Sequence, residues 1–221
     1  MHFSRTDQDS LYSVIRSRRD MRHFDPQGSV DPVVLERVLA AAHHAPSVGL
    51  MQPWRFIRIL DDVLRETIAE HVTEERLRTA SSLGSRKEEF QALKVEGVRE
   101  CAELLAVVMV PDDGTLFGRR TMPREMAVAS CACAIQNMWL ASRVENLGMG
   151  WVSLFDPEIV RKILQCPTGA FPLALVCLGP VQAFYQEPML EETGWRKGRS
   201  LAESIDENFY ADKKSIDEGI E

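Results

Sequence analysis

Residues 16–24 hold four arginines within seven positions, with Asp20 between them. Arg18 and Arg22 are four apart, which places both side chains on one face of a helix or helix end. A guanidinium group can donate to two phosphate oxygens at once, so this pair suits a phosphate-binding site. The alternative is a solvated basic helix end that complements the negative end of the helix dipole.

Asp20 is the acidic residue of this chain that is best suited to a chemical role. Three neighbouring arginines should lower the pKa of its carboxyl, so we expect an ionised carboxylate at neutral pH. Beside a bound phosphate compound such a group could orient the ligand or accept a proton. The other interpretation is an internal ion pair that orders the arginines.

Other catalytic motifs are weak or missing. The sequence contains no Gly-x-Gly-x-x-Gly, no P-loop and no Gly-x-Ser-x-Gly elbow, which argues against a Rossmann site, an ATP site and serine-hydrolase chemistry. His43 and His44 are possible general bases, but histidines at a helix end often cap its carbonyl groups. The five cysteines lack metal-ligand spacing and lie mostly in apolar segments, so we expect no metal site and a reducing, cytoplasmic location.

The composition of the chain argues against nucleic acids and membranes as binding partners. The 221 residues are 45% hydrophobic and 27% charged, as in soluble globular proteins, and the formal net charge is −7. An acidic chain argues against non-specific nucleic-acid binding. No long uncharged apolar run is present, so no membrane partner is expected. No linker separates two domains, which predicts a single domain over residues 1–221 with a frayed polar tail from about 212.

Apolar periodicity and capping residues predict alternating helices and strands around these motifs. Asp7 or Asp9 should cap a first helix that runs to Arg18, and Asp31-Pro32 should start the second. Residues 73–90 are charged and weakly patterned, which fits either a helix or a mobile cover over a site. The further expected helices are 61–72, 90–104, 123–146 and one after Asp156-Pro157, and the expected strands are 56–60, 105–110, 150–155 and 173–178.

The 123–146 helix is the most apolar of these and should lie at the centre of the core. We expect its buried stripe to consist of Met126, Ala129, Cys133, Gln136, Leu140 and Val144, with Ile135 and Trp139 close by. Gly148 should end the helix. A two-proline loop at 45–54 follows the second helix, and Ser200 and Glu203 have capping-box spacing near the end of the chain.

Several short motifs in this order resemble the FMN-dependent nitroreductase superfamily, over about residues 11–203. They are Arg-Arg-Asp-Met-Arg at 18–22, Ala-Pro-Ser…Gln-Pro-Trp at 45–54, Gly-x-Gly-Trp at 148–151 and the basic tail before Ser200. Two departures matter, because most nitroreductases carry serine at the position of Asp20 and asparagine at that of Leu50. With Ala-Leu-Lys-Val-Glu-Gly at 92–97, these departures resemble the flavin-destroying branch that makes the lower ligand of vitamin B12.

The resemblance implies an α+β fold with helices around a central, mostly antiparallel sheet, in an intertwined homodimer with two FMN sites at its interface. Arg18, Arg19 and Arg22 would hold the FMN phosphate and ribityl chain, and Asp20 and Ser153 would be the catalytic pair. Arg199 in the basic tail would add to the phosphate site. The residues that would complete the flavin contacts are Asp20, Met21, Ser47, Gln52, Leu93, Gly150 and Ser153.

The activity implied by this resemblance consumes its flavin. Reduced FMN and O2 would give 5,6-dimethylbenzimidazole, the lower ligand of cobalamin, and erythrose 4-phosphate, without a metal. A separate NAD(P)H-dependent flavin reductase would supply the reduced FMN. Two alternatives stay open: an NAD(P)H-dependent nitroreductase or quinone reductase that retains its FMN, and a flavin-binding carrier without turnover.

Overall fold

The computed structural model describes residues 2–210, and it divides after Gln186 into two compact units, each described here by itself. The first unit carries the sheet and its helices. The second holds α7 (Met189–Glu192) and a 3-10 turn at Ala202–Ser204. Ser200 and Glu203 form the expected reciprocal pair of hydrogen bonds, which joins the residues before that turn to the turn itself. The predicted frayed tail from 212 lies outside the described residues, and the single domain stays a prediction.

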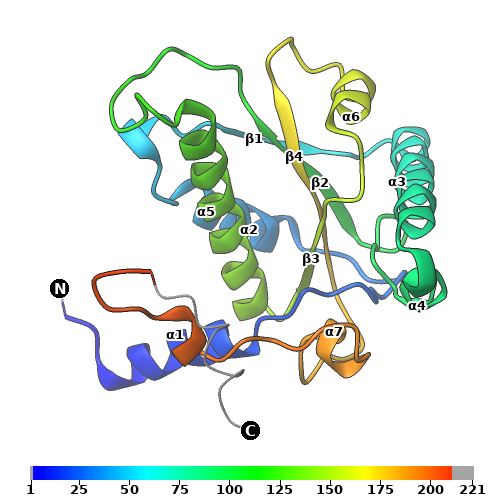
Figure 1. Cartoon of the computed structure of the whole chain (residues 1–221), viewed down its shortest axis with the longest axis horizontal. Helices are drawn as coiled ribbons and strands as arrows, with labels where there is room; N and C mark the ends of the chain where they lie inside the picture. The colour runs from blue at the N-terminus through cyan, green and yellow to red at the C-terminus, as the bar shows by residue number, and fades with distance from the viewer. Residues whose placement is uncertain (1, 211–221) are drawn as a thin grey trace, which may run out of the picture. The chain divides into compact units, whose positions relative to one another are not determined.

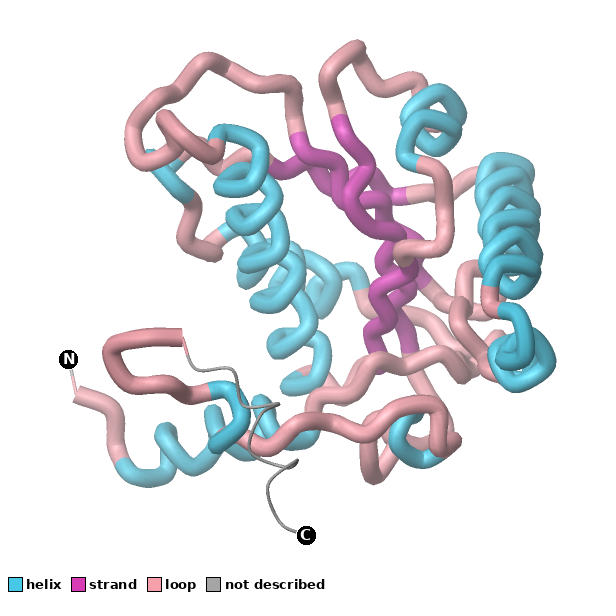
Figure 2. Tube along the Cα trace, in the orientation of Figure 1, coloured by secondary structure: helices cyan, strands magenta, loops and turns pink. Residues whose placement is uncertain are grey.

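One four-stranded sheet, entirely antiparallel, organises the first unit. Its strands are β1 (Trp54–Arg58), β2 (Glu103–Met109), β3 (Gly148–Val152) and β4 (Phe171–Gly179), in the order β1-β2-β4-β3. Figure 2 shows the strands running between two groups of helices. This arrangement confirms the predicted α+β class with an antiparallel sheet, although β1 and β3 begin and end two or three residues earlier than expected.

Both faces of the sheet are buried, because alternate residues of β2 and β4 enter different cores. Leu104, Ala106 and Val108 pack on one side, and Leu105, Val107 and Met109 on the other. The first core also takes residues of α3 (Asp62–Ser82) and α6 (Pro157–Ile163), and the second takes residues of α2 (Pro32–His43) and α5 (Pro123–Val144). Figure 1 shows these two pairs on opposite sides of the strands.

Local capping signals predicted the helix starts well, with one correction. The carboxylates of Asp31, Asp61 and Asp156 accept backbone N–H groups at the starts of α2, α3 and α6. The N-cap of α1 (Arg5–Ser17) is Ser4, so the prediction of Asp7 or Asp9 was wrong. Asp7 instead closes a capping box, since its carboxylate accepts the N–H of Ser4.

The expected helix at 90–104 was also wrong. α4 (Lys87–Ala92) ends early, and residues 93–102 form an irregular segment before β2. The Glu96 carboxylate accepts the N–H of Val98, which turns the chain. A Cβ on Gly97 would lie 2.6 Å from the Phe24 ring, so only glycine lets this segment approach. Residues 73–90, for which a helix and a mobile cover were both possible, are mostly helical: α3 continues to Ser82, and a 3-10 turn and α4 follow.

The buried stripe predicted for α5 was wrong, although its length was nearly right. The residues that face the core are Ala127, Ser130, Cys131, Ala134, Ile135, Met138 and Ser142. Cys133 and Val144 of the predicted stripe are exposed. The helix ends at Val144 with Glu145 as its C-cap, and Asn146 follows with φ 57°. Gly148 does not end the helix but begins β3. Because α5 has two apolar stripes, periodicity alone could not select the one that faces the sheet.

Candidate functional site

Residues 18–22, called here the arginine corner, follow the end of α1 and run along the edge of β3. Asp20 pairs with Met149 in an isolated parallel bridge, and the N–H of Met21 donates to the Met149 carbonyl at 2.9 Å. A Cβ at Gly150 would lie 2.3 Å from the Met21 carbonyl oxygen and 2.8 Å from Arg22 Nη1. Glycine at 150 therefore permits the close approach that builds the corner.

Asp20 is held from two directions within this corner. Its Oδ1 accepts the Trp151 N–H at 3.0 Å, and its Oδ2 accepts Arg22 Nη2 at 2.5 Å. The same Nη2 donates to the Trp151 carbonyl at 2.7 Å. The Arg22 side chain is only 8% exposed, whereas Asp20 keeps 43% of its side-chain surface open. The buried arginine thus orients a carboxylate whose remaining surface can meet a ligand.

The pKa of Asp20 is raised, so the expectation of a lowered pKa was wrong. Burial is the largest cause and disfavours the charged form; Arg22, the Trp151 N–H and Arg18 act in the opposite direction but do not cancel it. Although 43% of the Asp20 side chain is open to solvent, the protein around the carboxyl still disfavours its charge enough to raise the pKa. A raised pKa makes this carboxylate a better proton acceptor than a surface aspartate.

The three arginines of the corner have different environments. Arg18 Cζ lies 4.7 Å from the centroid of the Trp139 ring, and no hydrogen bond or ion pair engages its guanidinium within the described part of the chain. Arg19 is folded onto the carbonyl oxygens of Arg16, Arg18 and Gln186. Arg22 holds Asp20, and its Nη1 is buried with no hydrogen-bond partner. Arg18 is therefore the arginine best placed to meet a phosphate group.

Trp139 is a part of the site that sequence reasoning assigned only to the core. Its indole N–H donates to the carbonyls of Arg19 at 3.1 Å and Met149 at 3.0 Å, while its ring lies under Arg18. It thereby joins α5 to the corner and to β3. No spacing in the sequence connects residue 139 to residue 19, so only the fold could reveal this contact.

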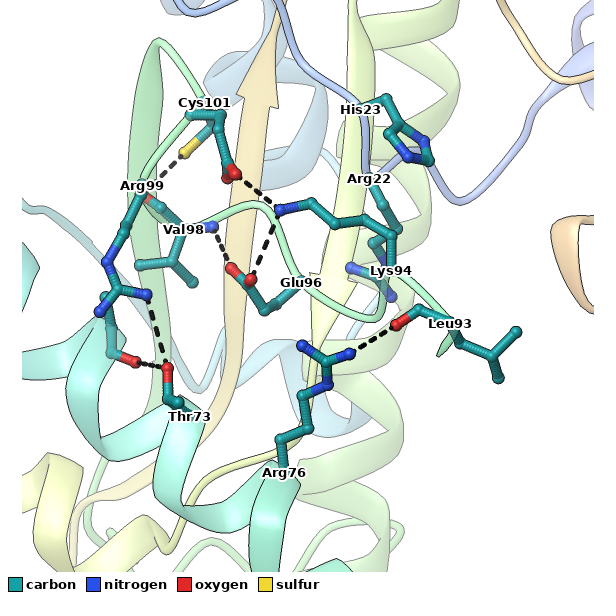
Figure 3. Close-up of polar contacts among 12 residues, drawn as sticks. Arg22, His23, Thr73, Arg76, Leu93, Lys94, Glu96, Val98, Arg99 and Cys101 are labelled. Carbon is teal, nitrogen blue, oxygen red and sulfur yellow. Dashed lines mark hydrogen bonds and ion pairs between the residues drawn. The ribbon is translucent and has the colours of Figure 1, made fainter. Parts of the chain in front are cut away.

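The 93–97 segment lies beside the corner, as Figure 3 shows. A Cβ at Gly97 would meet the Arg22 carbonyl oxygen at 3.0 Å. The Leu93 carbonyl accepts Arg76 Nη2 at 3.0 Å, and Lys94 Nζ pairs with Glu100 at 2.6 Å. The side chains of Leu93 and Met21 are buried in the protein. A contact of Met21 with a ligand would therefore involve its backbone.

Ser153 is exposed and comes two residues after Trp151, whose N–H binds Asp20. Ser153 directly follows β3, the strand whose Met149 and Trp151 contact Asp20. The pairing of Asp20 with Ser153 stays a prediction.

The 45–54 loop forms a second group of predicted site residues. Ser47 Oγ accepts the Gln52 N–H at 3.0 Å, and Gln52 Nε2 donates to the His43 carbonyl at 3.4 Å. Gly49, Leu50 and Gln52 all have positive φ, and Leu50 is 79% exposed. Leu50 and Gln52 carry backbone strain that glycine would avoid.

The two histidines at the end of α2 make structural contacts. Trp54 Nε1 donates to His43 Nδ1 at 3.3 Å, and His44 Nδ1 lies 2.8 Å from the Ala40 carbonyl. The interpretation of His44 as a helix-end cap is confirmed. Neither residue touches the arginine corner in these contacts.

The loop and the corner lie at opposite ends of α5 (Figure 1). The Val48 N–H donates to Ser130 Oγ at 3.2 Å, whereas Arg18 stacks on Trp139. Nine residues of helix separate these anchor points by about 14 Å. One chain therefore does not bring Ser47 and Gln52 together with the arginines. Arg199 belongs to the second unit, and its assignment stays a prediction.

Two further properties bear on the kind of site. Between residues 2 and 210, no group of three or more His, Cys, Asp or Glu side chains is arranged to hold a metal ion. None of the helices in that range has both the length and the apolar character needed to cross a membrane.

Comparisons with known proteins identify the family of this chain. The sequence profile of the nitroreductase family matches residues 15–180. The 5,6-dimethylbenzimidazole synthase of Rhodobacter capsulatus is 36% identical over 89% of this chain and 96% of its own length. The protein of that name from Rhodospirillum rubrum is 38% identical over 89% and 94%.

Solved structures share the fold at low identity. Iodotyrosine deiodinase bound to FMN and 3-iodo-L-tyrosine gives a TM-score of 0.71 at 18% identity, covering 90% of this chain and 100% of that one. Nitroreductase A from Vibrio parahaemolyticus gives 0.70 at 20% identity, covering 92% and 77%. The chain therefore belongs to the nitroreductase family of oxidoreductases and is similar, over nearly its whole length, to 5,6-dimethylbenzimidazole synthases.

Proposed function

We propose that this enzyme fragments reduced FMN with O2 to 5,6-dimethylbenzimidazole and erythrose 4-phosphate, and so supplies the lower ligand of cobalamin. The observation that carries the proposal is Asp20, a carboxylate of raised pKa fixed by Arg22 and the Trp151 N–H. The names of the relatives that match nearly the whole chain support the same activity.

The residues of the corner fit the phosphate end of FMN. Arg18 presents a half-buried guanidinium that makes no hydrogen bond or ion pair among the described residues, and Arg22 Nη1 is a buried donor without a partner. A bound phosphate would give the Arg18 guanidinium the charged partner that it lacks among these residues. Arg19 and Arg199 would complete this end of the site, and Met21 and Leu93 would contact the flavin.

The flavin ring would be held between Ser153 of one chain and the 45–54 loop of a second copy. Ser47 and Gln52 offer polar groups there, and Leu50 would exclude water from the ring. Because the loop and corner of one chain lie at opposite ends of α5, two copies in a homodimer would bring them together. The exposed Val144 on α5, and Leu11 and Ile15 on α1, supply apolar surface for that contact.

When bound, reduced FMN would supply the electrons that reduce O2, and it would also supply the ribityl chain that is cleaved. Asp20 would accept a proton near the first ribityl carbons, because Arg22 holds it between the phosphate end and the ring end of the site. The Ser153 hydroxyl would hydrogen-bond the ring beside it. The consumed flavin must be replaced at each turnover, so a separate NAD(P)H-dependent flavin reductase in the same cytoplasmic compartment would be the partner.

The test is the fate of the flavin. Purified protein is incubated with reduced FMN in air and without air, and the products are separated by chromatography. We expect dimethylbenzimidazole and erythrose 4-phosphate only in air, in equal amounts, with a matching loss of FMN. Complete recovery of FMN would reject the proposal. Rapid NAD(P)H oxidation with a nitroaromatic or quinone acceptor would then support the reductase alternative, and its absence would support the carrier.

A further inference from the structure

The 181–186 segment, which follows β4, contacts the arginine corner through Tyr185 and Gln186, and Phe184 packs next to the corner on Arg143. The Phe184 ring centroid lies 3.9 Å from Arg143 Cζ, and Arg143 Nε donates to the Ser17 carbonyl at 3.3 Å. The Tyr185 hydroxyl accepts the Arg22 N–H at 3.3 Å. The Gln186 carbonyl accepts the Arg19 guanidinium. The segment thus fixes residues on either side of Asp20.

Tyr185 makes the contact nearest to the chemistry. The Met21 N–H is the last backbone N–H of the corner that bonds to β3. The next one, the Arg22 N–H, bonds to the Tyr185 hydroxyl and would lack a partner without it. The Tyr185 hydroxyl also lies 2.5 Å from His23 Nδ1, and the two rings meet edge to face at 5.9 Å. This short contact with His23 fixes the orientation of the Tyr185 hydroxyl.

Tyr185 is held as a neutral phenol in this arrangement. It is half-buried, and burial raises its pKa. A neutral hydroxyl can accept from Arg22 and donate to His23 at the same time. Its hydrogen bonds go to Arg22 and His23, so its hydrogen-bonded connection to Asp20 runs through Arg22.

We propose that Tyr185, oriented by His23, is a positioning residue for the Asp20–Arg22 pair. This inference rests on the proposed function, in which Asp20 accepts a proton from reduced FMN. Tyr185 fixes the backbone at Arg22, Arg22 fixes the carboxylate, and the carboxylate meets the ligand. A phenylalanine would keep the packing of the ring but would release the Arg22 N–H.

The experiment compares Tyr185→Phe with Tyr210→Phe, which removes a hydroxyl from a side chain that is 94% exposed. Loss of one hydrogen bond between neutral groups predicts a roughly three- to tenfold lower kcat for dimethylbenzimidazole formation. KM for reduced FMN should stay within about twofold, and Tyr210→Phe should behave as wild type. His23→Ala should lower kcat in the same direction but by less than Tyr185→Phe.

A double-mutant cycle with Asp20→Asn separates positioning from general structural support. If Tyr185 acts through Asp20, Tyr185→Phe should cause no further loss of activity in the Asp20→Asn background. An equal loss in both backgrounds, or no loss in either, would overturn the proposal.

A second readout needs no turnover. Carbon-13 NMR of the Asp20 carboxyl should show a changed titration midpoint in Tyr185→Phe and an unchanged one in Tyr210→Phe. If wild type forms no dimethylbenzimidazole, the proposed reaction has failed, and this titration alone decides the positioning role. An unchanged Asp20 midpoint in Tyr185→Phe would reject that role.

Discussion

The arginine corner and the 45–54 loop differ in how far a single chain completes them. In the corner, Asp20 and Arg22 hold each other, and the edge of β3 holds both. The loop has positive φ at three residues and exposes Leu50 to solvent. A strained, exposed apolar loop gains most from a neighbouring surface. One chain holds the corner together by itself, and we expect the loop to gain its missing contacts from a second copy.

The largest effect is expected from a variant that removes the chemistry of the corner without disturbing its shape. Asp20→Asn keeps the hydrogen-bonding outline but removes the proton acceptor. General-base help is typically worth about 10²–10⁴ in rate, so dimethylbenzimidazole formation should fall by that factor. Affinity for reduced FMN should change little, and the flavin should be released intact. Product chromatography checks this, and formation at the wild-type rate would show that Asp20 only organises the arginines.

Removal of Arg22 should damage the corner itself. Breaking a buried ion pair by deleting one partner typically costs about 3–5 kcal/mol. That range applies to pairs in which both partners are buried, whereas here Arg22 is buried and Asp20 is partly open. We therefore expect Arg22→Ala to lower the free energy of unfolding by the lower end of that range. Arg37→Ala is the control, since it breaks the more exposed pair with Glu145 and should cost about 1 kcal/mol or less. Denaturant unfolding measures both, and equal losses would contradict a self-contained corner.

The dependence of the loop on a second copy can be tested on α5. Val144→Asp places a charge on the exposed apolar stripe, and Val63→Asp places one at a similarly exposed valine on α3. If Val144 lies in a dimer contact, its variant should raise the dimer dissociation constant at least tenfold and weaken FMN binding with it. Light scattering and flavin titration should leave Val63→Asp unchanged. A Val144→Asp monomer that binds FMN normally would show that one chain completes the site.

The arginines allow a finer test of the corner. Hydrogen bonds to charged groups contribute about 1.5–3 kcal/mol, so Arg18→Ala should weaken FMN binding roughly tenfold or more. Riboflavin, which lacks the phosphate, should bind almost as before. Arg19→Ala should discriminate less between the two flavins, because Arg19 is engaged by carbonyl groups. Equal losses for FMN and riboflavin in Arg18→Ala would exclude a phosphate contact at Arg18.

The smallest expected effect is a pH dependence of stability. Burial raises the pKa of Asp20 in the folded state above its unfolded value. Protonation therefore favours folding, and this stabilisation is complete below the unfolded pKa and is lost as pH rises through the folded pKa. The unfolding free energy of wild type relative to Asp20→Asn should therefore fall as pH rises above about 4, the ordinary pKa of an aspartate. A difference that stays flat as pH rises from that value would contradict the raised pKa.

Features encoded by neighbouring residues could be predicted from the sequence. Asp-Pro pairs marked the starts of α2 and α6, and the apolar runs marked β2 and β4. The motif at 18–22 located the corner. Each of these signals depends on local propensity and not on what the chain later packs against.

The rest depended on contacts between distant residues. The buried side of α5 was missed because both of its stripes are apolar and only the sheet selects one. The raised pKa of Asp20 needed the burial that β3 provides. The contact between His23 and Tyr185 joins residues 162 positions apart, which no spacing rule could anticipate.

The position of Trp139 gives the protein an internal optical reporter. Its indole lies under Arg18 and donates to the backbone of Arg19 and Met149. Emission from an indole is sensitive to a cation over its face, so movement of Arg18 toward an added phosphate compound would change the fluorescence of this side chain. With the other three tryptophans replaced by phenylalanine, occupation of the corner could be followed in real time, before any flavin is consumed.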